Sequence, residues 1–382
     1  MSEHTHTPHQ SIPAQPVGAA WQLETTIAAL EGGARAQALS RGEDALLLAV
    51  LHVAEPGAHV VVAPSLFGAH TGLFTQRLPQ FQVSVDVVED PDDAESWRAQ
   101  LGESTVALIA ESIADPRGDV LDFEEIAAVA HEHDAALIID STAATPALLR
   151  PLDLGADLVV HTSAHLLAGV PEEAGLLIDA GTVEPAARET PEVGQPLGED
   201  TAARILAGLQ HLAVRLTRQT ENAARLAARL SAHQGGASRG VHRTYYSGLA
   251  SSPCYERAGI YLRRGSGPLV SFEVRAQREP AAQSAAALAV VDLLSRFTHA
   301  GHRVTHPASS THAHLGEDQQ REAGARPGLV RVVVGDEPVE EFLAALDQAL
   351  AGLPGATAAA NVTPYESPAQ DHEPAVPGRG LR

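Results

Sequence analysis

The sequence contains no lysine, so each of its 26 basic residues is an arginine. No side chain therefore carries a primary amine. Arginine is no substitute in amine chemistry, because its guanidinium group stays protonated. We attribute most of this absence to compositional drift, since the chain is also rich in alanine, glycine, proline and arginine.

Cysteine and long apolar runs are equally scarce. A single cysteine, Cys254, excludes an internal disulfide. The apolar runs fall short of the ~20 residues that a membrane span needs, and the polar first ten residues do not have the layout of a signal peptide. The 48 acidic residues give a formal charge of −22, which repels nucleic acid and anionic lipid. The sequence thus predicts a cytoplasmic protein without nucleic-acid or membrane partners.

The 382 residues are enough for two or three domains. Composition and hydrophobic periodicity divide the chain into four parts. We expect a disordered arm over residues 1–20, a large domain over 21–235, a small domain over 236–353 and a disordered tail over 354–382.

Short apolar runs rich in β-branched residues alternate with segments suited to helices in the large domain. The expected strands span residues 59–64, 83–89, 106–112, 136–141, 157–163 and 175–181. Two helices are expected within residues 21–54 and one long helix over 201–233. This alternation predicts an α/β domain with a parallel sheet. Strands at 268–274 and 328–335, with helices at 285–297 and 338–353, predict a smaller α+β domain.

Three stretches together carry a family resemblance, and they span residues 63–81 (APSLFGAHTGLFTQRLPQF), 137–169 (beginning LIIDSTAATP) and 306–338 (beginning HPASSTHAHL). They resemble the Cys/Met-metabolism enzymes that depend on pyridoxal phosphate, such as cystathionine synthases and lyases and O-acetylhomoserine sulfhydrylases. The resemblance implies an aspartate-aminotransferase-like fold (fold type I), with a large cofactor domain and a smaller C-terminal domain. It also implies a homo-oligomer, or pairing with an active relative, although the family's N-terminal Tyr and Arg arm motif is not matched.

The resemblance places His165 where the family has its cofactor-binding lysine. In the family a His-Ser-Ala-Thr run precedes that lysine, and the matching run here is His161-Thr162-Ser163-Ala164. Imidazole cannot form a stable imine with the cofactor's aldehyde, and no other lysine exists to replace it. The prediction is therefore no cofactor, or pyridoxal or pyridoxamine phosphate bound without a covalent bond.

Four further positions match cofactor-binding residues of the family. Asp140 matches the aspartate beside the ring nitrogen, Phe67 the stacking tyrosine, Gly42 the glycine of the phosphate-binding turn, and Thr162 a hydroxyl suited to the phosphate. Asp140 also has a plainer interpretation, since a strand-end aspartate often caps the next turn.

Two acidic residues oppose cofactor binding at these matched positions. Glu43 places a carboxylate where the phosphate belongs, or simply neutralises an empty helix start. Asp115 replaces an asparagine expected near the ring.

Arg331 is the best surviving ligand anchor, because it matches the arginine that pairs with a substrate α-carboxylate. The alternative is a strand arginine paired with an acidic neighbour. A small amino-acid-like ligand is thus expected. No metal is predicted, although His161 and His165 would share a face if their segment were helical.

These substitutions favour a degenerate, noncatalytic homologue with a ligand-binding or partner role, which makes the chain a pseudoenzyme. Two alternatives remain open. One is an enzyme of sulfur amino-acid or related metabolism that holds pyridoxal or pyridoxamine phosphate noncovalently, with His165 as acid or base, as in certain sugar dehydratases of this fold. The other is an ordinary transsulfuration lyase or transferase.

Overall fold

The computed structural model describes residues 18–186, 193–234, 240–274, 276 and 279–353. The disordered tail expected over 354–382 and residues 1–17 of the expected arm lie outside the described residues. Helix α1 (Ala19–Glu31) includes the last two residues of the expected arm, 19 and 20.

A mixed sheet of seven strands forms the centre of the large domain, in the order β1-β9-β8-β7-β4-β2-β3. Strands β8, β7, β4, β2 and β3 are mutually parallel, whereas β9 runs antiparallel to both β8 and β1. The predicted parallel sheet is confirmed for those five strands. The strand bounds are β1 (Arg35–Leu39), β2 (His59–Val62), β3 (Ser84–Val87), β4 (Thr105–Glu111), β7 (Ala136–Asp140), β8 (Leu158–His161) and β9 (Gly175–Asp179).

Helices cover both faces of this sheet, because alternate residues of each central strand point to opposite sides. Val61, Leu108 and Ile139 pack on the side of α1 and α5, whereas Val60 and Ile138 pack on the side of α2. The helix bounds are α2 (Gly42–Val53), α3 (Pro64–Ala69), α4 (Ala94–Arg98), α5 (Phe123–Glu132), α6 (Thr145–Leu148), α7 (Ala164–Ala168) and α8 (Glu199–Leu209). Shorter elements are β5 (Ile113–Ala114), β6 (Asp119–Val120), η1 (Leu73–Arg77), η2 (Leu78–Phe81) and η3 (Pro151–Leu154).

Helix α5 illustrates how the sequence sets these elements. Asp122 caps its start by accepting a hydrogen bond from the backbone amide of Glu125. Acidic side chains occupy its first turn and His131 its last turn, which complements the helix dipole. Phe123 and Ile126 are buried against the sheet.

The small domain has a four-stranded antiparallel sheet in the order β10-β11-β13-β12. Its strands are β10 (Val241–Tyr245), β11 (Leu269–Val274), β12 (Arg303–Thr305) and β13 (Leu329–Val333). Helices α9 (Leu212–Ala232), α11 (Pro280–Leu294) and α13 (Glu340–Ala351) share one core with one face of this sheet. The remaining elements are α10 (Tyr255–Tyr261), α12 (Glu317–Glu322), η4 (Ser295–Ala300) and η5 (Pro307–Ser309).

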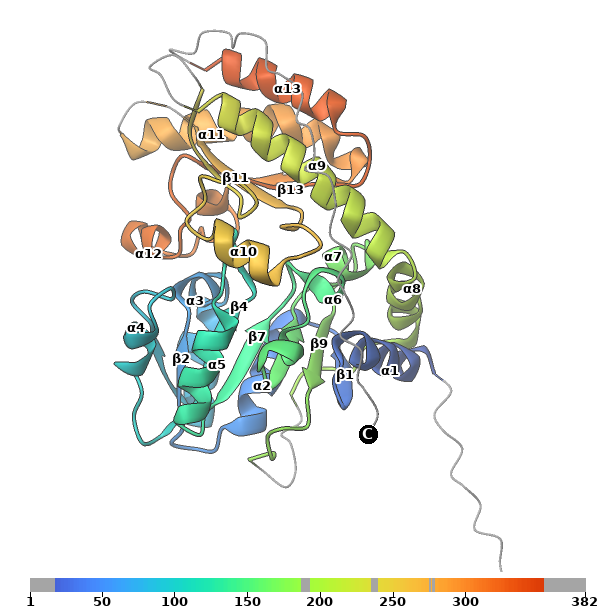
Figure 1. Ribbon diagram of the computed structural model, residues 1–382, viewed down its shortest axis with the longest axis vertical. Coiled ribbons are helices and arrows are strands. Elements are labelled where there is room, and N and C mark those ends of the chain that lie inside the picture. The colour runs from blue at the N-terminus through green and yellow to red at the C-terminus, as the bar shows by residue number, and fades with distance from the viewer. Residues whose placement is uncertain (1–17, 187–192, 235–239, 275, 277–278, 354–382) are drawn as a thin grey trace, which may run out of the picture.

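The two domains are joined by α9, which runs from the large to the small domain in Figure 1. The long helix expected over 201–233 is in fact two helices, because the chain turns at Gln210 and His211 between α8 and α9. Leu226 and Leu230 of α9 pack in the small core, whereas Ala258 of α10 packs in the large one. The domain boundary drawn at residue 235 is therefore crossed by side chains in both directions.

Sequence reasoning did not find the strands β1, β10 and β12, nor the two-residue strands β5 and β6. Each has exposed or half-buried positions along its length, and their burial patterns show no long apolar run. Among the described residues, no helix is both long and apolar enough to cross a membrane.

Candidate functional site

The carboxyl ends of the parallel strands lie at the edge of the large sheet that faces the small domain (Figure 1). Glu111 ends β4, Asp140 ends β7 and His161 ends β8. In parallel sheets these ends lie along one edge, where ligands commonly bind. This edge is therefore the candidate site.

Asp140 is the best-defined group at this edge, with only 5% of its surface exposed. Its Oδ1 accepts hydrogen bonds from the amide and hydroxyl of Thr142, and its Oδ2 accepts one from Thr162 Oγ1 at 3.0 Å. No arginine or histidine of the described residues lies within ion-pair distance of its carboxylate. Asp140 does cap the turn that follows β7, as its plainer interpretation predicted, but this buried anion also lacks a cationic partner.

Gly42 opens α2 against the turn that follows β8. A Cβ atom added at Gly42 would lie 1.9 Å from the carbonyl oxygen of Thr162. Packing alone therefore requires glycine at this position. The contact brings the start of α2 next to Thr162, as the family resemblance implied.

The acidic start of α2 is balanced by arginines. Arg77 Nη1 lies 2.7 Å from Asp44 Oδ1 and 3.8 Å from Glu43 Oε2, and Arg41 Nη2 lies 3.7 Å from Glu43 Oε2. Two carboxylates thus face two guanidinium groups. The repulsion that Glu43 was expected to exert on a phosphate is offset by Arg41 and Arg77, which the sequence had not connected with it.

Helix α3 presents an aromatic ring and an imidazole. Phe67 stacks on Phe74 with ring centroids 5.7 Å apart, so one face of Phe67 is already covered. His70 follows three residues later, and burial lowers its pKa, while the nearby Asp140 and Glu43 carboxylates oppose that shift. His70 is thus a site residue that the sequence analysis missed. Its spacing from Phe67, which places both on one helix face, was the available signal.

His165 lies in the first turn of α7, where its backbone amide donates to Ser163 Oγ. Its side chain is half-buried, and burial is the main cause that lowers its pKa. The positive charges of Arg303, Arg215 and Arg331 lower this pKa further. A hydrogen bond to the backbone of Val170 acts in the opposite direction and raises it. The neutral imidazole is therefore favoured.

Arg331 is held by Asp115. Its Nε donates to Asp115 Oδ1 at 2.6 Å and its Nη2 donates to Asp115 Oδ2, which makes the pair bidentate. In the structure Arg331 is therefore a strand arginine paired with an acidic neighbour, which is one of its two interpretations. Its role as a substrate anchor stays a prediction that would require this pair to open.

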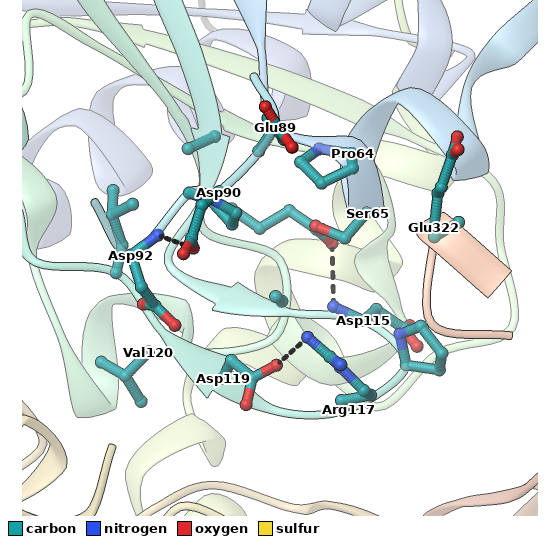
Figure 2. A pocket seen from close by; sticks show the side chains of 18 residues that line it. Pro64, Ser65, Glu89, Asp90, Asp92, Asp115, Arg117, Asp119, Val120 and Glu322 are labelled. Atoms are coloured by element: carbon teal, nitrogen blue, oxygen red, sulfur yellow. Dashed lines mark hydrogen bonds and ion pairs between the residues drawn. The ribbon is translucent and has the colours of Figure 1, made fainter. Parts of the chain in front are cut away.

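A cavity of about 200 Å³ borders the site beside Asp115. Figure 2 shows carboxylates from several segments around it, including Glu89, Asp90 and Asp119. Glu111 also lines it, and burial raises the pKa of Glu111 well above its usual value, with added repulsion from Asp115 and Asp140. Glu111 thus favours its protonated form. Because this wall is acidic, it suits a cationic group better than a phosphate.

The two histidines that would share a face if their segment were helical lie on different elements. His161 ends β8, whereas His165 belongs to α7, which begins at Ala164. His161 Nε2 lies 2.7 Å from Glu31 Oε1, and both residues are almost fully buried. Within the described ranges no group of three metal-binding side chains converges.

The lowered histidine pKa values predict a loss of stability in mild acid. For His312, 2% exposed, burial is the main cause that lowers the pKa. As pH falls below about 6.5, the unfolded chain binds a proton there that the folded chain resists. We expect the free energy of unfolding to fall by up to about 1.4 kcal/mol per pH unit for this residue.

Urea unfolding at several pH values between 7.5 and 5 measures how steeply the free energy of unfolding falls with pH. His312→Asn should make this dependence weaker. A wild-type free energy of unfolding that stays constant over this range would contradict the prediction.

Pyridoxal phosphate can be tested against these residues. The unpaired, buried Asp140 carboxylate suits a protonated ring nitrogen, and Phe67 and Thr162 lie on the adjoining α3 and β8–α7 turn. No side chain of this sequence offers a primary amine for the aldehyde. The residues therefore fit the ring of this cofactor.

Comparison with known proteins gives a consistent result. A family model described as "Cys/Met metabolism PLP-dependent enzyme" matches residues 18–351. The chain is 34% identical to O-acetyl-L-homoserine sulfhydrylase of Corynebacterium glutamicum, covering 87% of this chain and 83% of that protein. It is 32% identical to O-succinylhomoserine sulfhydrylase of Pseudomonas aeruginosa, covering 87% and 81% respectively.

A solved structure shares the fold. It is described as an O-acetylhomoserine (thiol)-lyase of Campylobacter jejuni that contains N'-pyridoxyl-lysine-5'-monophosphate. The TM-score is 0.77 at 24% identity, over 87% of this chain and 86% of that one. The expected fold type I architecture is thus confirmed.

These relatives correct one prediction. The noncatalytic, pseudoenzyme interpretation is wrong, because relatives that are 30–34% identical over most of the chain bear the names of active transsulfuration enzymes. That interpretation rested on the missing lysine and on the other substitutions at matched positions, whereas the buried Asp140 carboxylate is still present at the end of β7.

Proposed function

Since the chain belongs to the Cys/Met-metabolism family of pyridoxal-phosphate-dependent enzymes, we propose that it is a transsulfuration-type enzyme that holds its cofactor noncovalently. Its substrate is an α-amino acid with a sulfur or acyloxy substituent in the side chain, the class named for its relatives. The observation that carries this proposal is the buried Asp140 carboxylate, which has no cationic partner among the described residues.

Asp140 is the residue that would hold a proton on the ring nitrogen of the bound cofactor. Thr142 and Thr162 fix the orientation of its carboxylate through hydrogen bonds to both oxygens. When bound, the cofactor ring withdraws electrons from the substrate α-carbon. A carboxylate that is buried and fixed is well suited to keep the ring charged, because it cannot be screened by water.

His165 moves the proton. Its lowered pKa favours the neutral imidazole, which accepts a proton from the substrate near neutral pH and can return it later. A lysine in this position would perform the same transfer and also bind the aldehyde. His165 supplies only the first of these roles, so the cofactor depends on Asp140 and the surrounding contacts to stay in place.

The test combines binding and turnover. Titration of the protein with pyridoxal phosphate should give a saturable change in absorbance, and O-acetyl-L-homoserine with sulfide, or cystathionine, should be turned over. We expect Asp140→Ala to weaken cofactor binding at least tenfold, because a charged hydrogen-bond partner is lost. The matched control Asp153→Ala removes an exposed carboxylate on η3 that pairs with Arg150, and it should leave binding unchanged. Absence of both binding and turnover would refute the proposal.

A further inference from the structure

The small sheet presents one of its faces to the candidate site. In the antiparallel pairing of β12 with β13, Arg303 lies opposite Val333 and Thr305 lies opposite Arg331. Side chains opposite each other, or two residues apart, share a face. Val333 of this set packs in the large-domain core, whereas Val304 and Val332 pack in the small-domain core. Arg303, Thr305 and Arg331 therefore share the face toward the large domain.

The two arginines on this face differ in their partners. Arg331 is engaged by Asp115 through two of its nitrogens, so much of its charge is already neutralised. Arg303 is exposed and makes no hydrogen bond or ion pair with any of the described residues. A carboxylate that enters the site therefore has to displace Asp115 to form the bidentate pair with Arg331 but displaces nothing to reach Arg303.

Two further observations bear on this face of the small sheet. After burial, the charge of Arg303 is the largest cause that lowers the pKa of His165, and Arg331 on the same face contributes as well. Thr305, two residues along the same face, has a buried hydroxyl oxygen without a hydrogen-bond partner in the described part of the chain. An unpaired guanidinium and an unpaired hydroxyl thus lie on the sheet face that carries Arg331.

We propose that Arg303 binds the α-carboxylate of the substrate and so takes over the anchoring role that Asp115 denies to Arg331. This inference rests on the proposed function only for the class of ligand, an α-amino acid. The arrangement makes Asp115 a specificity-determining residue, because its carboxylate fills the position that a second ligand carboxylate would otherwise occupy.

The test compares L-methionine with L-methioninamide, which lacks the carboxylate charge. Calorimetry gives a dissociation constant for each, without cofactor and again with pyridoxal phosphate. Wild-type protein should prefer methionine by about 10- to 100-fold, the range expected for hydrogen bonds between charged groups. Arg303→Gln should abolish this preference, while the control Arg321→Gln, an exposed arginine of α12, should keep it.

A double variant makes the test sharper. Asp115→Asn releases Arg331, so the combination of Asp115→Asn with Arg303→Gln should regain a preference for methionine. The proposal is overturned if wild-type protein shows no preference, or if Arg303→Gln retains it and Arg331→Gln loses it. A preference that depends on Arg303 in a protein without turnover would instead refute the proposed function and leave this assignment intact.

Discussion

Replacing His165 by lysine is expected to change cofactor binding from noncovalent, and lost on gel filtration, to covalent. The new ε-amine would lie at the start of α7, in the position that the family resemblance gives to its lysine. Partial burial, together with Arg303 and Arg331 nearby, should lower the pKa of the amine and raise its uncharged, nucleophilic fraction. After borohydride reduction, mass spectrometry should find the cofactor attached at residue 165 in this variant alone.

The matched control is His165→Arg, which introduces a cation of similar length without an amine nucleophile. Wild-type protein and this control should both lose pyridoxal phosphate completely on gel filtration, whereas the lysine variant should retain it in near-stoichiometric amount. Covalent trapping in wild-type protein would show that another group of the protein reacts with the aldehyde. Equal loss from all three proteins would show that the aldehyde does not lie near residue 165.

Removing the Glu31 carboxylate is expected to cost about 3 kcal/mol of folding free energy. Glu31 and His161 are 0% and 1% exposed, and their Oε1 and Nε2 atoms lie 2.7 Å apart. Glu31→Ala leaves the imidazole buried without this partner, which is the costly way to break such a pair. Because Thr162 follows His161 directly, the β8–α7 turn that carries Asp140's hydrogen-bond donor should also loosen.

Urea unfolding measures this loss of folding free energy. Glu31→Gln is the conservative variant, because it keeps a hydrogen-bonding group of the same size. Its free energy of unfolding should fall much less than that of Glu31→Ala. Glu132→Ala removes a largely exposed carboxylate and should change stability by less than about 0.5 kcal/mol. If Glu31→Ala costs less than 1 kcal/mol, the buried pair is not a stabilising contact.

Much of the fold could be predicted from hydrophobic patterns. The strands β2, β4, β7, β8, β9, β11 and β13 all fall within or beside apolar runs of the sequence. The strands β1, β10 and β12 could not be found, since their neighbours rather than their own patterns hold them in place. The break between α8 and α9 was missed for a similar reason, because apolar periodicity continues across Gln210 and His211.

The residues of the candidate site also fall into two groups, those that the sequence predicted and those that only the structure revealed. Motifs in the sequence pointed to Asp140, Thr162, Gly42, Phe67 and His165, and all of them lie on elements at one edge of the large sheet. Glu111 and Arg303 entered the site only through interactions between distant segments. Their side chains acquire a role from their neighbours, which no local pattern records.

The sequence by itself determined the family resemblance and the absence of any side-chain amine, because both depend on residue identity alone. Only the tertiary structure decided which charges are still available to a ligand. Asp115 and Arg331 are 216 positions apart and neutralise each other, as Glu43 and Arg77 do in part across α2 and η1. Such pairings depend on distances between side chains, and those distances exist only once the two sheets are packed together.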